Sequence, residues 1–105
     1  MRLTDFEIQT IQTLTKKHFG ELSRVFLFGS RVNDALKGGD IDLFISNSNE
    51  SVLNLENKIC FLVDLKRSIG DRKIDVVLDV ATIRLRESFY HSIATTGVEL
   101  TKIEN

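Results

Sequence analysis

The segment that most constrains the fold spans residues 29–45 and reads GSRVNDALKGGDIDLFI. Its last third alternates polar and apolar residues, which predicts a strand over 40–46. Side chains of a strand point to alternate faces, so Asp40 and Asp42 project from the same side. A chain with this pattern is therefore expected to build a sheet that carries two neighbouring carboxylates on one face.

A short apolar run over 24–28 stops at Gly29 and predicts a buried strand that turns abruptly into a short helix. Ser30 is placed to cap that helix. Backbone amides at a helix N-terminus bind anions, although most Gly-Ser pairs between a strand and a helix are only turn and cap residues. Taken alone, this turn is a weak indication of a phosphate site.

The N-terminal helix has clear boundary signals. Thr4 and Glu7 stand at the spacing of a capping box around a start near Asp5, and Gly20 provides the backbone freedom that ends the helix. His18 lies in the last turn, where a helix dipole favours a cation, so we interpret it as structural.

The rest of the chain continues the alternation of strands and helices. We expect a long helix over 52–69, a strand over 73–80, a helix over 83–95 and a short strand over 98–101. The 105 residues then form one domain, 1–105, built as a small α/β sheet. A domain of this size buries only a modest core, so a second chain or a second copy is expected to complete the site.

The third expected strand adds a carboxylate to the first two. Asp75 alternates with Ile74 and Val76 and falls on the polar face, whereas Asp79 lies near the strand end and is interpreted as structural. Two carboxylates about 6 Å apart repel by roughly 3 kcal/mol at an effective dielectric near 20. A divalent cation between the carboxylates replaces this repulsion with attraction. Oxygen ligands with no Cys or His placed beside them favour Mg²⁺ or Mn²⁺.

Charge and hydropathy exclude several classes of protein. The formal net charge is −1 at pH 7, without the basic excess that binds a phosphate backbone, so nucleic acid is not expected as the main ligand. No run is apolar enough to cross a bilayer and no signal peptide is apparent, so we expect a cytoplasmic protein without membrane contact. Cys60, the single cysteine, stands among apolar residues and is expected to be a buried thiol.

Three short motifs resemble the nucleotidyltransferases of the DNA polymerase β superfamily: Gly29-Ser30, the strand 40–43 reading DIDL, and the strand 73–77 reading KIDVV. The resemblance covers nearly the whole chain. It implies a nucleotidyltransferase fold of the α/β (α+β) class, with a small mixed sheet and helices packed mainly on one face. The length, and the closing run over 93–100, are similar to minimal nucleotidyltransferases, which are typically encoded beside a helical HEPN protein as toxin and antitoxin.

The resemblance also implies roles for matching residues. Gly29 and Ser30 would hold the nucleotide phosphates, and Arg31 would offer them a charge unless it is an ordinary surface arginine. The metal ligands and catalytic carboxylates would be the three aspartates Asp40, Asp42 and Asp75. Asp75 would also be placed to help deprotonate an attacking hydroxyl.

The leading functional hypothesis is transfer of AMP from Mg-ATP to a hydroxyl, expected to be a tyrosine, of a HEPN-type toxin that is thereby silenced. An alternative is an antitoxin that only occludes its partner. It rests on apolar groups that we expect at an interface: Phe26 or Phe28, Phe44 and Val77 on the aspartate face, and Leu53 and Phe61 off the main stripe of the long helix. A third hypothesis, adenylylation of a small molecule such as an antibiotic, lacks a separate acceptor pocket unless a homodimer builds one.

Overall fold

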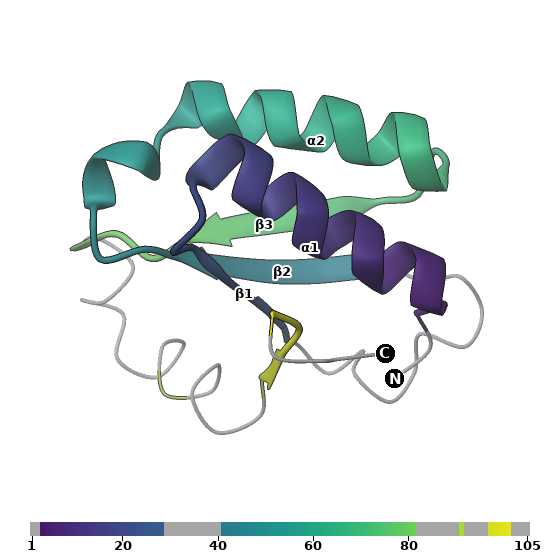
Figure 1. Cartoon of the computed structure of the whole chain (residues 1–105), viewed down its shortest axis with the longest axis horizontal. Helices are drawn as coiled ribbons and strands as arrows, with labels where there is room; N and C mark the ends of the chain where they lie inside the picture. The colour runs from purple at the N-terminus through teal and green to yellow at the C-terminus, as the bar shows by residue number, and fades with distance from the viewer. Residues whose placement is uncertain (1–2, 29–40, 82–90, 92–96, 102–105) are drawn as a thin grey trace.

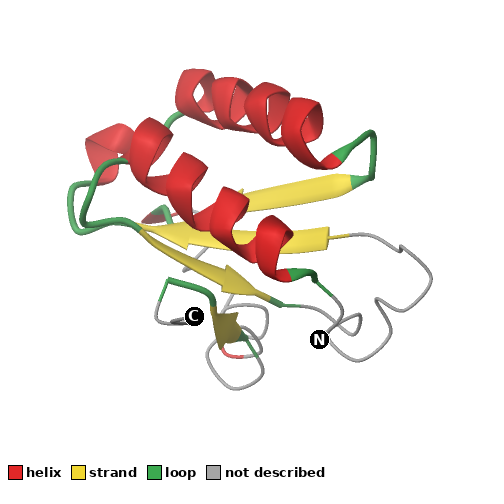
Figure 2. Ribbon diagram, turned by 45° about the vertical axis from the view of Figure 1, so that its right-hand side comes forward, coloured by secondary structure: helices red, strands yellow, loops and turns green. Residues whose placement is uncertain are grey.

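The described residues of the computed structural model form a mixed sheet of four strands with two α-helices on one of its faces (Figures 1 and 2). The structure describes residues 3–28, 41–81, 91 and 97–101. In chain order the elements are α1 (Asp5–Phe19), β1 (Arg24–Leu27), β2 (Ile41–Ser46), the 3-10 helix η3 (Glu50–Val52), α2 (Leu55–Ile69), β3 (Ile74–Leu78) and β4 (Val98–Glu99). The predicted α/β class with a small mixed sheet is confirmed, and both described α-helices lie on one face of it.

The strands lie in the order β3-β2-β1-β4. β1 pairs antiparallel with β2 and with β4, whereas β2 and β3 run parallel. A parallel pair needs a long crossover connection, and here η3 and α2 supply it. This crossover places α2 on the face shared with α1 and leaves the other face of β2 and β3 without α1 or α2 (Figure 2).

The predicted N-terminal cap of α1 is present in full. The Thr4 hydroxyl accepts a hydrogen bond from the Glu7 backbone N–H at 3.1 Å, and the Glu7 carboxylate accepts one from the Thr4 N–H at 2.9 Å. Gly20 ends the helix at φ 103°, a left-handed conformation that residues with a Cβ rarely adopt. The start and the end of α1 therefore follow from local sequence.

The long helix begins later than its apolar pattern predicts. Instead of starting at Val52, the chain first makes η3, capped by Asn49, and α2 then starts at Leu55. The Asn54 side chain accepts a hydrogen bond from the Asn57 backbone N–H at 2.8 Å. Two asparagine caps in succession separate the turn from the helix, because asparagine competes for backbone donors.

The core lies between the helices and the sheet. Its buried members include Ile11 and Phe19 from α1, Phe61 and Leu65 from α2, and the inner residues of the strands, Val25, Leu27, Ile41, Leu43, Ile45, Ile74 and Val76. The Phe19 and Phe61 rings lie 5.6 Å apart between their centroids. Phe61 and Leu53 were expected at an interface, and this prediction is wrong because both side chains are buried within the chain.

The prediction for Cys60 is also wrong, since its side chain is exposed. Consecutive residues of an α-helix are separated by about 100° of rotation, so burial of Phe61 turns Cys60 away from the core. Apolar neighbours in the sequence indicated burial but did not determine which side of the helix faces the sheet.

His18 is held by a side chain from another helix. Its Nε2 lies 2.7 Å from Oδ2 of Asp64 on α2, and its ring packs edge-on against Phe61. Lys17 reaches the same carboxylate oxygen at 3.1 Å. These contacts join the C-terminal turn of α1 to the middle of α2, which the helix-dipole argument did not include.

Two predicted elements fall on residues outside the described ranges. They are the short helix after Gly29 and nearly all of the helix over 83–95. The short strand expected over 98–101 is present as β4, which spans two residues and pairs with β1.

We predict that Phe61→Ala destabilises the fold by about 3–5 kcal/mol, because it leaves a cavity between the helices and the sheet. Urea unfolding followed by circular dichroism measures this change. Phe6, which is 60% exposed on α1, offers a matched control, and Phe6→Ala should change stability by less than about 0.5 kcal/mol. Equal losses in the two variants would contradict the placement of Phe61 in the core.

The contacts of Asp64 predict a pH-dependent contribution to stability. Its hydrogen bond with His18, followed by that with Lys17, lowers the pKa of the Asp64 carboxyl from its ordinary value of 3.8. The ionised carboxylate is thus favoured in the folded state, so its stabilising contribution is present above the unfolded pKa and is lost as the pH falls through the lowered folded pKa. Wild-type protein should therefore be more stable than Asp64→Asn at pH 6, and the difference should disappear in strong acid. A difference in unfolding free energy that is constant across this range would contradict the assignment.

Candidate active site

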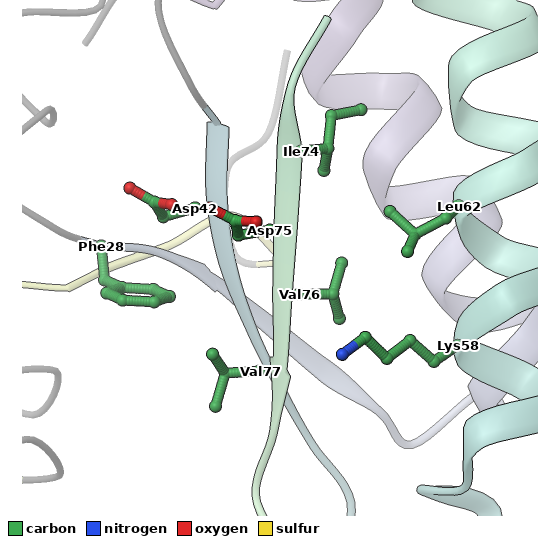
Figure 3. A pocket seen from close by; sticks show the side chains of 8 residues that line it. All are labelled: Phe28, Asp42, Lys58, Leu62, Ile74, Asp75, Val76 and Val77. Carbon is green, nitrogen blue, oxygen red and sulfur yellow. The ribbon is translucent and has the colours of Figure 1, made fainter.

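The parallel pairing of β2 and β3 brings two predicted site residues together. Asp42 on β2 is the direct register partner of Asp75 on β3. Neighbouring strands lie about 4.8 Å apart, and side chains of register partners leave the sheet on the same face. Figure 3 shows both carboxylates side by side, on the side of the strands away from α2.

Alternation along each strand explains why these carboxylates face outward. The residues that flank Asp42, Ile41 and Leu43, are buried, as are Ile74 and Val76 on either side of Asp75. Asp42 is partly buried and Asp75 is exposed. The apolar core therefore fixes the orientation of both acids, because a slip by one residue would bury them.

The two acids line a pocket of about 560 Å³ at the edge of the sheet formed by β3. Figure 3 shows that its walls lie on both sides of this strand. One side presents Phe28, Asp42, Asp75 and Val77, and the other presents Lys58, Leu62, Ile74 and Val76. Since β3 is the edge strand of the described sheet, the pocket is reached from the surface of the protein.

Phe28, which follows β1 and precedes Gly29, lies at this pocket. Its backbone N–H donates a hydrogen bond to the Asp42 carbonyl at 3.0 Å, just beyond the last pairing of β1 with β2. Phe28 is also the residue that immediately precedes Gly29. The chain therefore enters the segment 29–40 beside Asp42.

Four of the predicted site residues belong to that segment and lie outside the described residues: Gly29, Ser30, Arg31 and Asp40. Their predicted roles stay predictions. Of the six predicted site residues, the structure thus brings together Asp42 and Asp75, which come from different strands.

The apolar groups expected on the aspartate face are partly covered within the chain. Phe44 is buried, and its ring centroid lies 6.1 Å from that of Phe26 across the β1–β2 pair. The expectation that Phe44 forms an interface is therefore wrong. Phe28 and Val77 are partly buried and line the pocket instead.

Two lining residues, Lys58 and Leu62, were not anticipated. Both lie on α2, four residues apart, and reach the pocket from the helix side of β3 (Figure 3). A helical pattern places them on one side of α2 but does not reveal which strand that side approaches. Asp79, interpreted as structural, lies in a separate pocket with Arg24 and Asn47.

The donor set of Asp42 and Asp75 suits a hard cation. Carboxylate oxygens are the ligands of Mg²⁺ and Mn²⁺, and Mg²⁺ commonly uses one or two carboxylates together with substrate phosphates. Among the described residues, no cluster of three or more His, Cys, Asp or Glu side chains could hold a metal ion. A cation at this pair would need further oxygen ligands, from a substrate or from residues outside the described ranges.

The described residues thus form an α/β sheet in which two parallel strands carry an outward pair of carboxylates. The family model described as Polymerase beta, Nucleotidyltransferase matches residues 9–104. Since this match spans nearly the whole chain, the protein belongs to the polymerase β nucleotidyltransferase family. The superfamily suggested by the three sequence motifs is confirmed.

No curated protein matches the chain significantly. Within the described ranges, neither helix has the length and apolar character needed to cross a membrane.

If the carboxylate pair binds a divalent cation, the cation should stabilise the fold. We predict that Mg²⁺ or Mn²⁺ raises the unfolding free energy of the wild-type chain by about 2.7 kcal/mol at one hundred times its dissociation constant. Asp75→Asn should remove this gain and, without metal, should be slightly more stable than wild type because it relieves repulsion from Asp42. Thermal unfolding across a metal titration measures both effects.

Asp79→Asn is the matched control for this titration, since Asp79 follows the same strand but lies outside the pocket. It should keep the stabilisation by metal. An equal gain in wild type and Asp75→Asn would show that the cation acts elsewhere.

Proposed function

We propose that the protein transfers AMP from Mg-ATP to a hydroxyl group of a protein partner, and that this partner is a HEPN-type toxin which the modification silences. The single observation that carries the transfer is the register pairing of Asp42 with Asp75 at an accessible pocket. The family assignment supports nucleotidyl transfer as the class of chemistry.

The proposed reaction forms one bond and breaks another. The acceptor oxygen attacks the α-phosphorus of ATP, the bond from that phosphorus to the bridging oxygen breaks, and pyrophosphate leaves with the displaced electron pair. The acceptor proton passes to a carboxylate, and Asp75 is the more exposed of the two described acids. Asp42 and Asp75 would hold Mg²⁺ or Mn²⁺, with Asp40 as a third ligand. When bound, the cation neutralises phosphate charge and aligns the nucleophile with the leaving group.

The remaining site residues would act on the nucleotide. Gly29 and Ser30 would bind the phosphates through backbone amides and the hydroxyl, and Arg31 would add a positive charge. The backbone hydrogen bond from Phe28 to Asp42 supports this assignment, because it starts that segment beside the acidic pair.

The position of the pocket supports a macromolecular acceptor. Asp75 is exposed on the edge strand of the described sheet, and the pocket walls continue around that strand to Lys58. A hydroxyl carried on another protein can therefore approach the acid from the surface. The toxin identity rests on the similarity of the run over 93–100 to minimal nucleotidyltransferases.

The proposal predicts labelling of the HEPN partner by ATP that carries a radioactive α-phosphate. Asp42→Asn should lower the rate by at least about 100-fold, since loss of a ligand removes several kcal/mol of transition-state stabilisation. Asp79→Asn should retain the wild-type rate. Scintillation counting of the partner gives the rate, and mass spectrometry identifies the modified residue.

Other outcomes of this labelling experiment would favour one of the alternative functions. If wild-type protein binds ATP yet labels no partner, the proposed transfer is wrong. If Asp42→Asn and Asp75→Asn both fail to transfer AMP but still neutralise the toxin, the protein acts by occlusion. Labelling of a small-molecule acceptor, without labelling of the partner, would favour adenylylation of a small molecule such as an antibiotic.

A further inference from the structure

The outer face of α2 carries an apolar stripe that the fold of one chain does not use. Leu55, Ile59 and Val63 follow one another at intervals of four residues and are 67%, 51% and 46% exposed. They lie on the side of the helix away from Phe61 and Leu65, which are fully buried. Figure 1 shows α2 at the outer surface of the molecule, with α1 and the sheet beneath it.

This stripe departs from the usual pattern of a surface helix. A helix that covers a sheet normally presents charged and polar residues to water on its outer side. Here the side opposite the core has three large aliphatic residues in one row, so α2 has two apolar faces. An exposed row of this kind, bordered by charges, is typical of an interaction surface.

The charges around the stripe are arranged asymmetrically along α2. Glu56 lies in the first turn, whereas Lys66 and Arg67 lie in the last turn. Arg67 continues the series at four residues after Val63, and Glu56 stands beside Leu55 at the opposite end. These signs also complement the helix dipole, which accounts for the charges but not for the apolar residues between them.

The apolar stripe and the charges around it are complementary to those of a second α2 helix that runs in the opposite direction. In an antiparallel pair of α2 helices, Ile59 of each copy meets Val63 of the other, and Glu56 of each copy lies near Lys66 and Arg67 of the other. Both ends then carry attractive pairs, whereas a parallel pair would bring like charges together. A two-fold dimer uses the same patch on both subunits, as this arrangement requires.

We propose that α2 is a dimerisation element that packs antiparallel against α2 of a second copy of this chain. A helix of 15 residues is about 22 Å long, so the contact is short and the dimer should dissociate on dilution. Asp42 and Asp75 lie on the other side of the sheet, and dimerisation through α2 leaves both acidic pairs accessible (Figure 3). Such a dimer would form whether or not the chain transfers AMP.

Sedimentation velocity over a range of concentrations tests the apolar part of the contact. Wild-type protein should change from monomer to dimer as concentration rises, and Ile59→Glu should remain monomeric. Leu22→Glu is the matched control: Leu22 is 79% exposed but follows α1, so this variant should dimerise like wild type. Circular dichroism verifies that each variant is folded.

Mixing two charge variants tests the partner and the orientation. Glu56→Lys should weaken the dimer about tenfold, and so should Lys66→Glu combined with Arg67→Glu. An equimolar mixture of these two variants should associate as tightly as wild type, because every contact then joins opposite charges. Loss of fold stability in either variant cannot produce such a recovery.

Three results would overturn the proposal. They are a wild-type chain that stays monomeric at every concentration, an Ile59→Glu variant that dimerises normally, and a mixture of charge variants that associates no better than its components. A stripe that binds the HEPN protein in place of a second copy would give the first result.

Discussion

The parallel pairing of β2 with β3 is the interaction on which the candidate site depends. It makes Asp42 and Asp75 neighbours although they are far apart in the chain, and it requires the crossover through α2. The same crossover places α2 on the face shared with α1, so that, among the described helices, neither covers the face that carries the acidic pair. If the register shifted by one residue, the acids would turn toward the core and the apolar residues toward water.

The paired strands β2 and β3 are stabilised by buried apolar residues but carry a local electrostatic repulsion. Residues on either side of Asp42 and Asp75 are buried and hold the strands together, while the acids repel each other. A divalent cation held between the two carboxylates, as proposed, would offset this repulsion. Ion pairs also join other parts of the described chain: Asp64 contacts His18 and Lys17 between the helices, and Arg72 contacts Glu7 at 2.7 Å.

Local signals predicted the fold well where a few neighbouring residues decide the structure. The capping box at Thr4 and the glycine after α1 gave the limits of that helix, and alternation gave the faces of β2 and β3. Predictions failed where the rotation of a helix had to be known. Cys60 is exposed and Phe61 is buried, because the contact with Phe19 determines which side of α2 faces inward.

The sequence by itself determined the α/β class, the family motifs and the identity of the outward-facing acids, since caps and strand alternation act over a few residues. Only the tertiary structure decided that Asp42 lies beside Asp75, that Lys58 reaches their pocket from α2, and that His18 meets Asp64. The apolar stripe on α2 also became evident only there. These features depend on strand order and helix rotation, which are set by packing between segments distant in the chain.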